Sequence, residues 1–77
     1  MKLEKIKLLA EHGFAFTSDF KVKELTGRFV GIDYNKEKNM FGFFVKRHVY
    51  FSTAEDVSRI KNEIDEVFAL VCELNNR

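Results

Sequence analysis

Aromatic and basic side chains are concentrated in residues 40–52, MFGFFVKRHVYFS. This segment contains five aromatic residues and three that are basic or carry an imidazole. Flat aromatic rings can stack on nucleic-acid bases while neighbouring cations neutralise phosphates, as in sheet proteins that hold single strands. The same rings could instead contact a second copy of the chain. The segment therefore predicts a contact surface for either protein or single-stranded nucleic acid.

The two-residue period of a strand decides which of these side chains face the same way. Successive side chains of a strand point to opposite sides, so odd and even positions separate. The odd positions, which we assign to the core, carry Phe41, Phe43, Val45, Val49 and Phe51. The opposite face, extended by residues of two preceding strands, is the predicted partner-binding or nucleic-acid-binding surface, formed by Lys21, Lys23, Phe29, Phe44, Lys46, His48 and Tyr50.

A long C-terminal helix offers a second candidate surface. Residues 52–55, STAE, have the form of a capping box, in which Ser52 and Glu55 satisfy each other's backbone amides at a helix start. Apolar residues then recur at steps of three and four, as in a helix that packs on a core. This seam consists of Val57, Ile60, Ile64, Val67, Val71 and Leu74. The additional apolar residues, which predict either a dimer interface or contact with a first helix, are Phe68, Leu70 and Cys72.

Patterns of catalytic and metal-binding residues are missing from the sequence. His12 and His48 belong to no nucleophile or metal signature, and no glycine-rich phosphate loop occurs. The adjacent acids Asp65 and Glu66 fall on a solvated helix face, where paired carboxylates seldom act as acid and base. The single cysteine, Cys72, cannot form an internal disulfide, and we interpret it as a small buried hydrophobe. We therefore expect a protein that is not an enzyme and that uses no metal and no cofactor.

The first part of the chain is expected to form a helix and a strand. Apolar residues at helical spacing predict a short amphipathic helix over residues 2–12, which Gly13 ends. Residues 14–23 alternate between apolar and polar, which predicts a half-buried strand with a kink near residues 18 and 19. The alternative is a brief helix over residues 18–27, capped by Ser18.

The pairing of the next two strands follows from their apolar patterns. If Tyr34 of the strand over residues 28–34 lies opposite Phe41, the apolar faces of both strands point the same way. The same register sets Gly31 opposite Phe44, whose ring can cover the bare backbone. The strand over residues 40–51 is longer than its partner over residues 28–34. Its second half would therefore pair with the first strand or with a second copy.

These elements predict one α+β domain over residues 1–77. The expected order is α-β-β-β-α, a three-stranded antiparallel meander with a short N-terminal helix and a long C-terminal helix packed on one face. This order resembles, over residues 28–75, that of small transcription coactivators that bind single strands, although no motif is shared.

Length and charge narrow the class of protein. A chain of 77 residues buries only about 60–65% of the surface of its unfolded form, so association would help to stabilise it. Residues 1–51 hold ten basic and six acidic side chains, whereas residues 52–77 hold three and six. This polarity permits an anionic partner or head-to-tail contact between copies.

Location and function are inferred from the apolar segments, the single cysteine and the predicted surfaces. The longest apolar run is too short to span a membrane, the start is unlike a signal peptide, and a single cysteine suits a reducing compartment, so we expect a cytoplasmic protein. We expect a small non-enzymatic interaction or regulatory module that forms a homodimer and acts through protein–protein contacts. The alternative is binding of single-stranded nucleic acid through the aromatic and basic face of the sheet.

Overall fold

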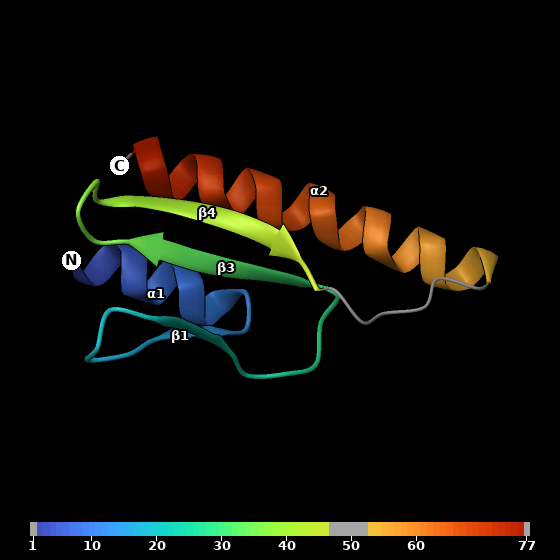
Figure 1. Cartoon of the computed structure of the whole chain (residues 1–77), viewed down its shortest axis with the longest axis horizontal. Coiled ribbons are helices and arrows are strands. Elements are labelled where there is room, and N and C mark those ends of the chain that lie inside the picture. The colour runs from blue at the N-terminus through green and yellow to red at the C-terminus, as the bar shows by residue number, and fades with distance from the viewer. Residues whose placement is uncertain (1, 47–52, 77) are drawn as a thin grey trace.

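The chain folds into two small antiparallel sheets and two helices. The computed structural model describes residues 2–46 and 53–76. The elements are α1 (Leu3–Glu11), β1 (Phe14–Phe16), β2 (Val22–Glu24), β3 (Val30–Asn35), β4 (Met40–Val45) and α2 (Ala54–Asn76). β1 pairs with β2, and β3 pairs with β4. Figure 1 shows α2 running along the β3–β4 sheet, while α1 and the β1–β2 hairpin lie beyond β3. The α+β prediction is confirmed, but a single three-stranded meander is not formed.

The predicted first strand is a hairpin instead. Residues 17–21 form its turn, in which the Thr17 amide donates to the Lys21 carbonyl at 2.8 Å and the Phe20 amide donates to the Thr17 carbonyl at 3.0 Å. Phe20 takes a left-handed backbone conformation with a φ of 61°. The alternative helix over residues 18–27 is not formed either, because residues 22–24 pair with β1. The break near residues 18 and 19 is therefore a full reversal of the chain.

The predicted register of the second sheet is confirmed. Tyr34 lies opposite Phe41, and Gly31 lies opposite Phe44. A Cβ atom placed on Gly31 would lie 2.5 Å from the Phe44 ring, so the ring does cover the bare backbone. The loop between the strands is held by the Asn35 side chain, whose Oδ1 accepts from the amides of Glu37 and Lys38 at 3.1 Å.

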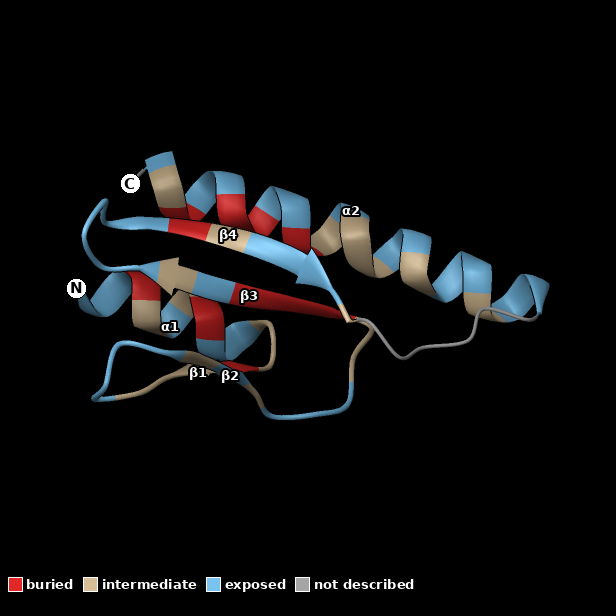
Figure 2. Cartoon of the chain, viewed as in Figure 1, coloured by how far each residue is buried: buried red, intermediate tan, exposed pale blue. Residues whose placement is uncertain are grey.

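One apolar core joins the two sheets to α2. Its buried residues are Leu9, Phe14, Val30, Ile32, Phe41, Val67, Leu70, Val71 and Leu74. The predicted core face of β4 is only partly covered, because Phe41 is buried whereas Phe43 and Val45 are 38% and 41% exposed. Figure 2 shows this change from buried to exposed along β4. Val49 and Phe51 lie outside the described residues.

The helices differ in detail from the sequence expectation. In α1 the buried residues are Lys5 and Leu9, while Leu3 is 63% exposed, so the buried stripe is rotated toward Lys5. At the start of α2, the Thr53 hydroxyl accepts from the Asp56 amide at 3.1 Å and serves as the cap. Ser52, the predicted cap, lies outside the described residues.

Candidate functional site

Four of the predicted surface residues gather beside β2 and β3. Lys23, Phe44 and Lys46 line a hollow of about 360 Å³, and Lys21 and Phe44 line an adjoining one of about 260 Å³. Val22 and Ile32 line both hollows. We call these two hollows together the β2–β3 groove. The ring of Phe44, which is 47% exposed, forms one wall of it.

Two of the three lysines beside this groove lie next to carboxylates. Lys46 forms a half-buried ion pair with Glu24. Lys21 lies 3.8 Å from Asp19, and both side chains are exposed. The hydroxyl of Thr17 donates to Asp19 and lowers the pKa of that carboxyl, with a smaller contribution from Lys21. The surface is therefore less positive than the count of lysines in the sequence indicates.

Phe29 does not share this face. Its amide donates to Glu63 Oε1 of α2 at 3.0 Å, and the Arg59 guanidinium lies 5.2 Å from its ring centroid. Phe29 thus packs toward α2, since the strand start is tied to that helix. His48 and Tyr50, the remaining predicted members of the face, lie outside the described residues.

The predicted helix surface separates into buried and exposed residues. Leu70 is 2% exposed and belongs to the core, whereas Phe68 is 57% exposed. Cys72 is also exposed, so the expectation that it is a buried hydrophobe is wrong. The Phe68 ring packs edge-to-face on the Phe43 ring, with 6.1 Å between their centroids. Because Val45 points to the same side of β4 as Phe43, these three residues form an exposed apolar surface, which we call the Phe43–Phe68 patch.

The outer edge of β4 has free backbone groups next to this patch. The Lys46 amide donates to the Phe29 carbonyl at 3.0 Å, which marks residues 29 and 46 as a hydrogen-bonded pair. Hydrogen-bonded and non-hydrogen-bonded pairs alternate along an antiparallel ladder, so the N–H and C=O of Phe41, Phe43 and Val45 point away from β3. Among the described residues, no strand pairs with this side of β4.

Asn75 of α2 satisfies one position of this edge. Its Oδ1 accepts from the Phe41 amide at 2.7 Å, and its Nδ2 donates to the Phe41 carbonyl at 3.0 Å. The side-chain amide thus acts as a one-residue substitute for a neighbouring strand. The positions that stay open are Phe43 and Val45, and we call their outward N–H and C=O groups the β4 edge.

The other side of β3 faces β2. By the same alternation the N–H and C=O of Val30 and Ile32 point away from β4, toward β2. β2 belongs to the other sheet, and within residues 2–46 and 53–76 no hydrogen-bonded ladder joins it to β3. Yet Val30 and Ile32 are 0% and 3% exposed. These residues are therefore covered by the rest of the chain, in which β2 lies close to β3.

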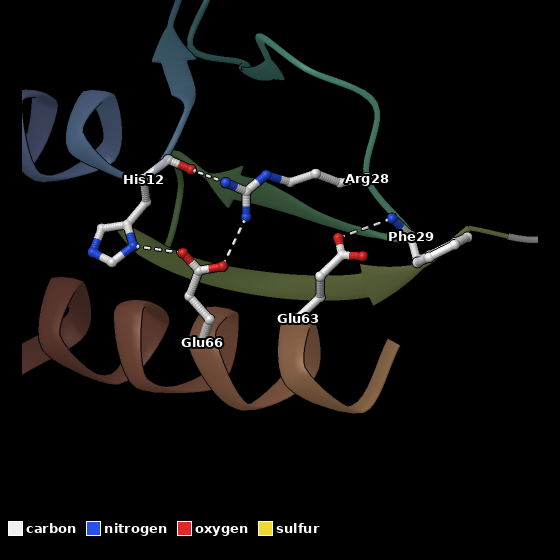
Figure 3. A network of polar contacts seen from close by, with 5 residues as sticks. All are labelled: His12, Arg28, Phe29, Glu63 and Glu66. Carbon is white, nitrogen blue, oxygen red and sulfur yellow. Dashed lines mark hydrogen bonds and ion pairs between the residues drawn. The ribbon is translucent and has the colours of Figure 1, made fainter. Parts of the chain in front are cut away.

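A polar network, shown in Figure 3, ties the end of α1 and the start of β3 to α2. Arg28 donates to Glu66 Oε1 at 3.0 Å through Nη1 and to the His12 carbonyl through Nη2. His12 Nδ1 lies 3.0 Å from Glu66 Oε2. The hydrogen bond from His12 and the guanidinium of Arg28 lower the pKa of Glu66. We call His12, Arg28 and Glu66 the Arg28 clamp, and its contacts all serve to hold segments together.

Sequence reasoning missed Arg28, Glu63, Glu66 and Asn75. Each of them makes contacts with residues at least 16 positions away in the chain. The sequence does place Glu63 and Glu66 three residues apart, and therefore on one side of the helix. This spacing is the feature of the sequence that could have indicated a polar contact on this side of α2.

Other kinds of site find no support in the described part of the chain. No group of three or more His, Cys, Asp or Glu side chains in residues 2–46 and 53–76 could hold a metal ion. No described helix has the length and apolar character needed to cross a bilayer. No family model matches the chain, and neither a curated protein nor a solved structure shows significant similarity to it.

Proposed function

We propose that the chain is a small, non-enzymatic interaction module of the cytoplasm that forms a homodimer through the β4 edge. The observation that carries the proposal is the coincidence of free backbone groups with exposed apolar side chains. Phe43 and Val45 supply the free groups, and both also belong to the Phe43–Phe68 patch. Residues 40–45 contain no charged residue and no proline, the features that usually protect an edge strand from pairing.

A two-fold arrangement fits this edge without disturbing Asn75. An antiparallel pair of β4 strands centred on Phe44 places Phe43 opposite Val45 of the second copy, and the reverse. Both positions have outward N–H and C=O groups, so each forms a hydrogen-bonded pair, and four bonds result. Phe44 then lies opposite Phe44 of the second copy, about 4.5–5.5 Å away at Cβ, as an aromatic cross-strand pair.

The available apolar area indicates modest affinity. A buried phenylalanine covers about 150–250 Å², and the Phe43, Phe44 and Phe68 side chains are 38%, 47% and 57% exposed. Together with Val45 they offer roughly 300 Å² per copy, against about 800 Å² in a standard stable interface. We therefore expect self-association in the micromolar range, with the strand hydrogen bonds setting its geometry.

Replacing Val45 by proline tests the edge directly. Proline removes the outward N–H of residue 45 but no ladder bond to β3, so the fold should persist. Sedimentation velocity over a concentration series should show a dimer for the wild type and at least a tenfold weaker dimer for Val45→Pro. Val45→Thr keeps the N–H and serves as the matched control, which should still dimerise. A strictly monomeric wild type at tens of micromolar, or undiminished association of Val45→Pro, would refute the proposal.

Binding of single-stranded nucleic acid is the second candidate. It is supported by the half-exposed Phe44 ring beside Lys23 and Lys46. It is weakened by the pairing of Lys46 with Glu24 and of Lys21 with Asp19. Fluorescence anisotropy with a labelled single-stranded oligonucleotide across a salt series tests it, because phosphate contacts make binding salt-dependent. Absence of salt-sensitive binding would remove this candidate.

A further inference from the structure

We propose that α2 packs antiparallel against α2 of a second copy when two β4 edges pair. The inference rests on the homodimer proposed above and adds a helix contact to its interface. In this contact, which we call the α2 pair, Lys61 of each copy lies over the Phe68 ring of the other.

The strand edge alone offers little area for a dimer. The Phe43–Phe68 patch and Phe44 provide roughly 300 Å² per copy, whereas a standard interface buries about 800 Å² per partner. A second contact would therefore strengthen the dimer. α2 is the element that can supply it, because it lies next to the β4 edge, where Asn75 bonds to the Phe41 backbone.

One side of α2 faces the space beyond β4. The Phe68 ring packs on Phe43, and Asn75 reaches the outward backbone groups of Phe41. Phe68 and Asn75 are two helical turns apart and therefore lie on the same side of the helix. Steps of three and four residues continue this side toward the start of α2 and define the α2 stripe, which consists of Val57, Lys61, Ile64, Phe68, Cys72 and Asn75.

The exposed apolar residues of the helix lie on this stripe. Val57 and Phe68 are 52% and 57% exposed, and they are the large apolar residues that α2 exposes within the described residues. Cys72 is exposed as well. The other side of α2 carries Glu63 and Glu66, which bond to the start of β3 and to the Arg28 clamp. The stripe is therefore the side of α2 that is free to pack on a second helix.

The spacing of strands and helices allows the two copies of α2 to touch. α2 contacts both β3 and β4, so its axis lies over this pair of strands. In a sheet extended through the β4 edge, the centres of the two strand pairs are two strand spacings apart, which is about 10 Å. Packed helices have axes about 8–10 Å apart. The second α2 would therefore lie against the first.

The position of the two-fold axis along α2 follows from two contacts. Asn75 lies beside Phe41, and Phe68 lies beside Phe43 further along the strand, so α2 runs antiparallel to β4 (Figure 1). The two-fold axis passes through the β4 pair at Phe44, one strand residue beyond Phe43. By the same progression it meets α2 about three to four residues before Phe68. The centre of the α2 pair therefore lies midway between residues 61 and 68.

This centre makes the stripe complementary to itself. Lys61 of one copy lies opposite Phe68 of the other, and Val57 lies opposite Cys72, because the members of each pair are equally far from the centre. The alkyl part of Lys61 can cover the Phe68 ring while its ammonium group lies between that ring and the carboxylate of Asp65, one turn away. Lys61 and Asp65 are both exposed in the single chain. A second copy therefore matches the stripe in apolar character and in charge.

Cysteine cross-linking tests the arrangement, because residues near a two-fold axis lie close to their own counterparts. Asp65→Cys in a Cys72→Ser background should form an inter-chain disulfide in a glutathione buffer. Asn62→Cys in the same background is the matched control, since Asn62 is also exposed but lies beside Arg28 on the other side of α2. Asp65→Cys should give at least about tenfold more cross-linked dimer than Asn62→Cys. In the wild type the two Cys72 residues are about 22 Å apart along the helices and should not cross-link.

A double-mutant cycle tests the contact between Lys61 and Phe68. Within one chain these residues are about 10 Å apart along the helix, so coupling between them reports a contact between copies. Dissociation constants from sedimentation velocity should rise for Lys61→Ala and for Phe68→Ala. The double variant should be at least about fivefold tighter than the product of the two effects, because each substitution removes the same two contacts. Arg59→Ala, which removes a cation from the other side of α2, should combine with Phe68→Ala within about twofold of the product.

The outcomes separate the α2 pair from the dimer itself. A wild type that dimerises and is weakened by Val45→Pro, but whose residue 65 cross-links no better than residue 62, would keep the β4-edge dimer and overturn the α2 pair. Cross-linking through Cys72 in the wild type would overturn it too, because the helices would then meet at another level. So would independent effects of Lys61→Ala and Phe68→Ala. A strictly monomeric wild type would refute the dimer and the α2 pair together.

Discussion

At Gly31 the strand has no side chain, and the Phe44 ring fills the space. A Cβ atom there would lie 2.5 Å from Cζ of that ring, so Gly31→Ala must displace the ring. We expect Gly31→Ala to lower the free energy of unfolding by about 1 kcal/mol in the wild type. In the Phe44→Ala background the same change should be neutral or stabilising by up to about 1 kcal/mol, since glycine weakens a strand interior.

Urea denaturation of the two single variants and the double variant measures whether the effect of Gly31→Ala on the free energy of unfolding changes sign when Phe44 is removed. The coupling free energy between positions 31 and 44 should lie between about 0.5 and 3 kcal/mol. Additive effects would show that the ring does not rest on the glycine. The contact between Gly31 and Phe44 was predictable from sequence, because it follows from the register of β3 and β4 and from the alternation of side chains along each strand.

A single amide side chain fixes the end of α2 to β4. Asn75 replaces a strand at Phe41 through one accepted and one donated hydrogen bond. Asn75→Ala should therefore lower the free energy of unfolding by about 1–2 kcal/mol, measured by urea denaturation. Asn76→Ala is the matched control, because Asn76 is the exposed neighbour, and it should change stability by less than about 0.5 kcal/mol. Equal effects of the two substitutions would contradict the role of Asn75.

At the scale of elements, the β1–β2 hairpin shows why part of the fold escaped prediction. Phe14 pairs with Glu24 and Phe16 pairs with Val22, so both residues of each pair have even numbers. The even positions that are apolar in β1 are therefore followed by apolar even positions in β2, with no shift at the turn. A hairpin of this register has the same pattern as one long strand. Only the turn at residues 17–21 distinguishes them, and it contains neither glycine nor proline to mark it.

The β3–β4 pair lacked this ambiguity, because the polar loop at residues 35–39 separates two clear patterns. The candidate site was harder to predict. Phe44, Lys23 and Lys46 were identified by alternation, which is a local property. Phe29 and Leu70 were misplaced, since their burial depends on how α2 lies across the sheet. The β4 edge could not be foreseen from a sequence that gives no information on which strands fail to pair.

At the scale of the whole molecule, the Arg28 clamp makes stability depend on pH. The pKa of Glu66 is lowered from its usual value of 4.5, first by the hydrogen bond from His12 and then by Arg28. A carboxyl whose pKa is lower in the folded state stabilises the fold above its unfolded pKa. This contribution is lost as the pH falls below about 4.5 and through the folded pKa. It is modest, because the Glu66 side chain is 39% exposed.

Glu66→Gln isolates this contribution. The difference in free energy of unfolding between wild type and Glu66→Gln should shrink as the pH is lowered from about 5 toward 3. Urea denaturation at a series of pH values measures it. Some acid sensitivity should remain in the variant, because the pKa of Asp19 is lowered as well. A difference that stays constant from pH 6 to pH 3 would show that Glu66 is not held as a carboxylate by the clamp.

Arg28 bonds to both halves of the molecule from a largely buried position. Its side chain is 18% exposed, it bonds to the end of α1 and to α2, and its guanidinium lies 4.9 Å from the Phe14 ring centroid. Arg28→Ala should lower the free energy of unfolding by about 2–3 kcal/mol, because charged hydrogen bonds at a half-buried site are lost. Arg59→Ala removes an exposed arginine that lies over Phe29, and it should cost only about 0.5–1 kcal/mol.

Hydrogen exchange locates the effect of Arg28→Ala in the molecule. α1 and the β1–β2 hairpin contribute only Leu9 and Phe14 to the buried core, whereas its other seven residues belong to β3, β4 and α2. Loss of Arg28 should therefore release the first unit before the second, and its amides should lose more protection. Uniform loss of protection, or an effect no larger than that of Arg59→Ala, would mean that the two units unfold together and that the core alone joins them.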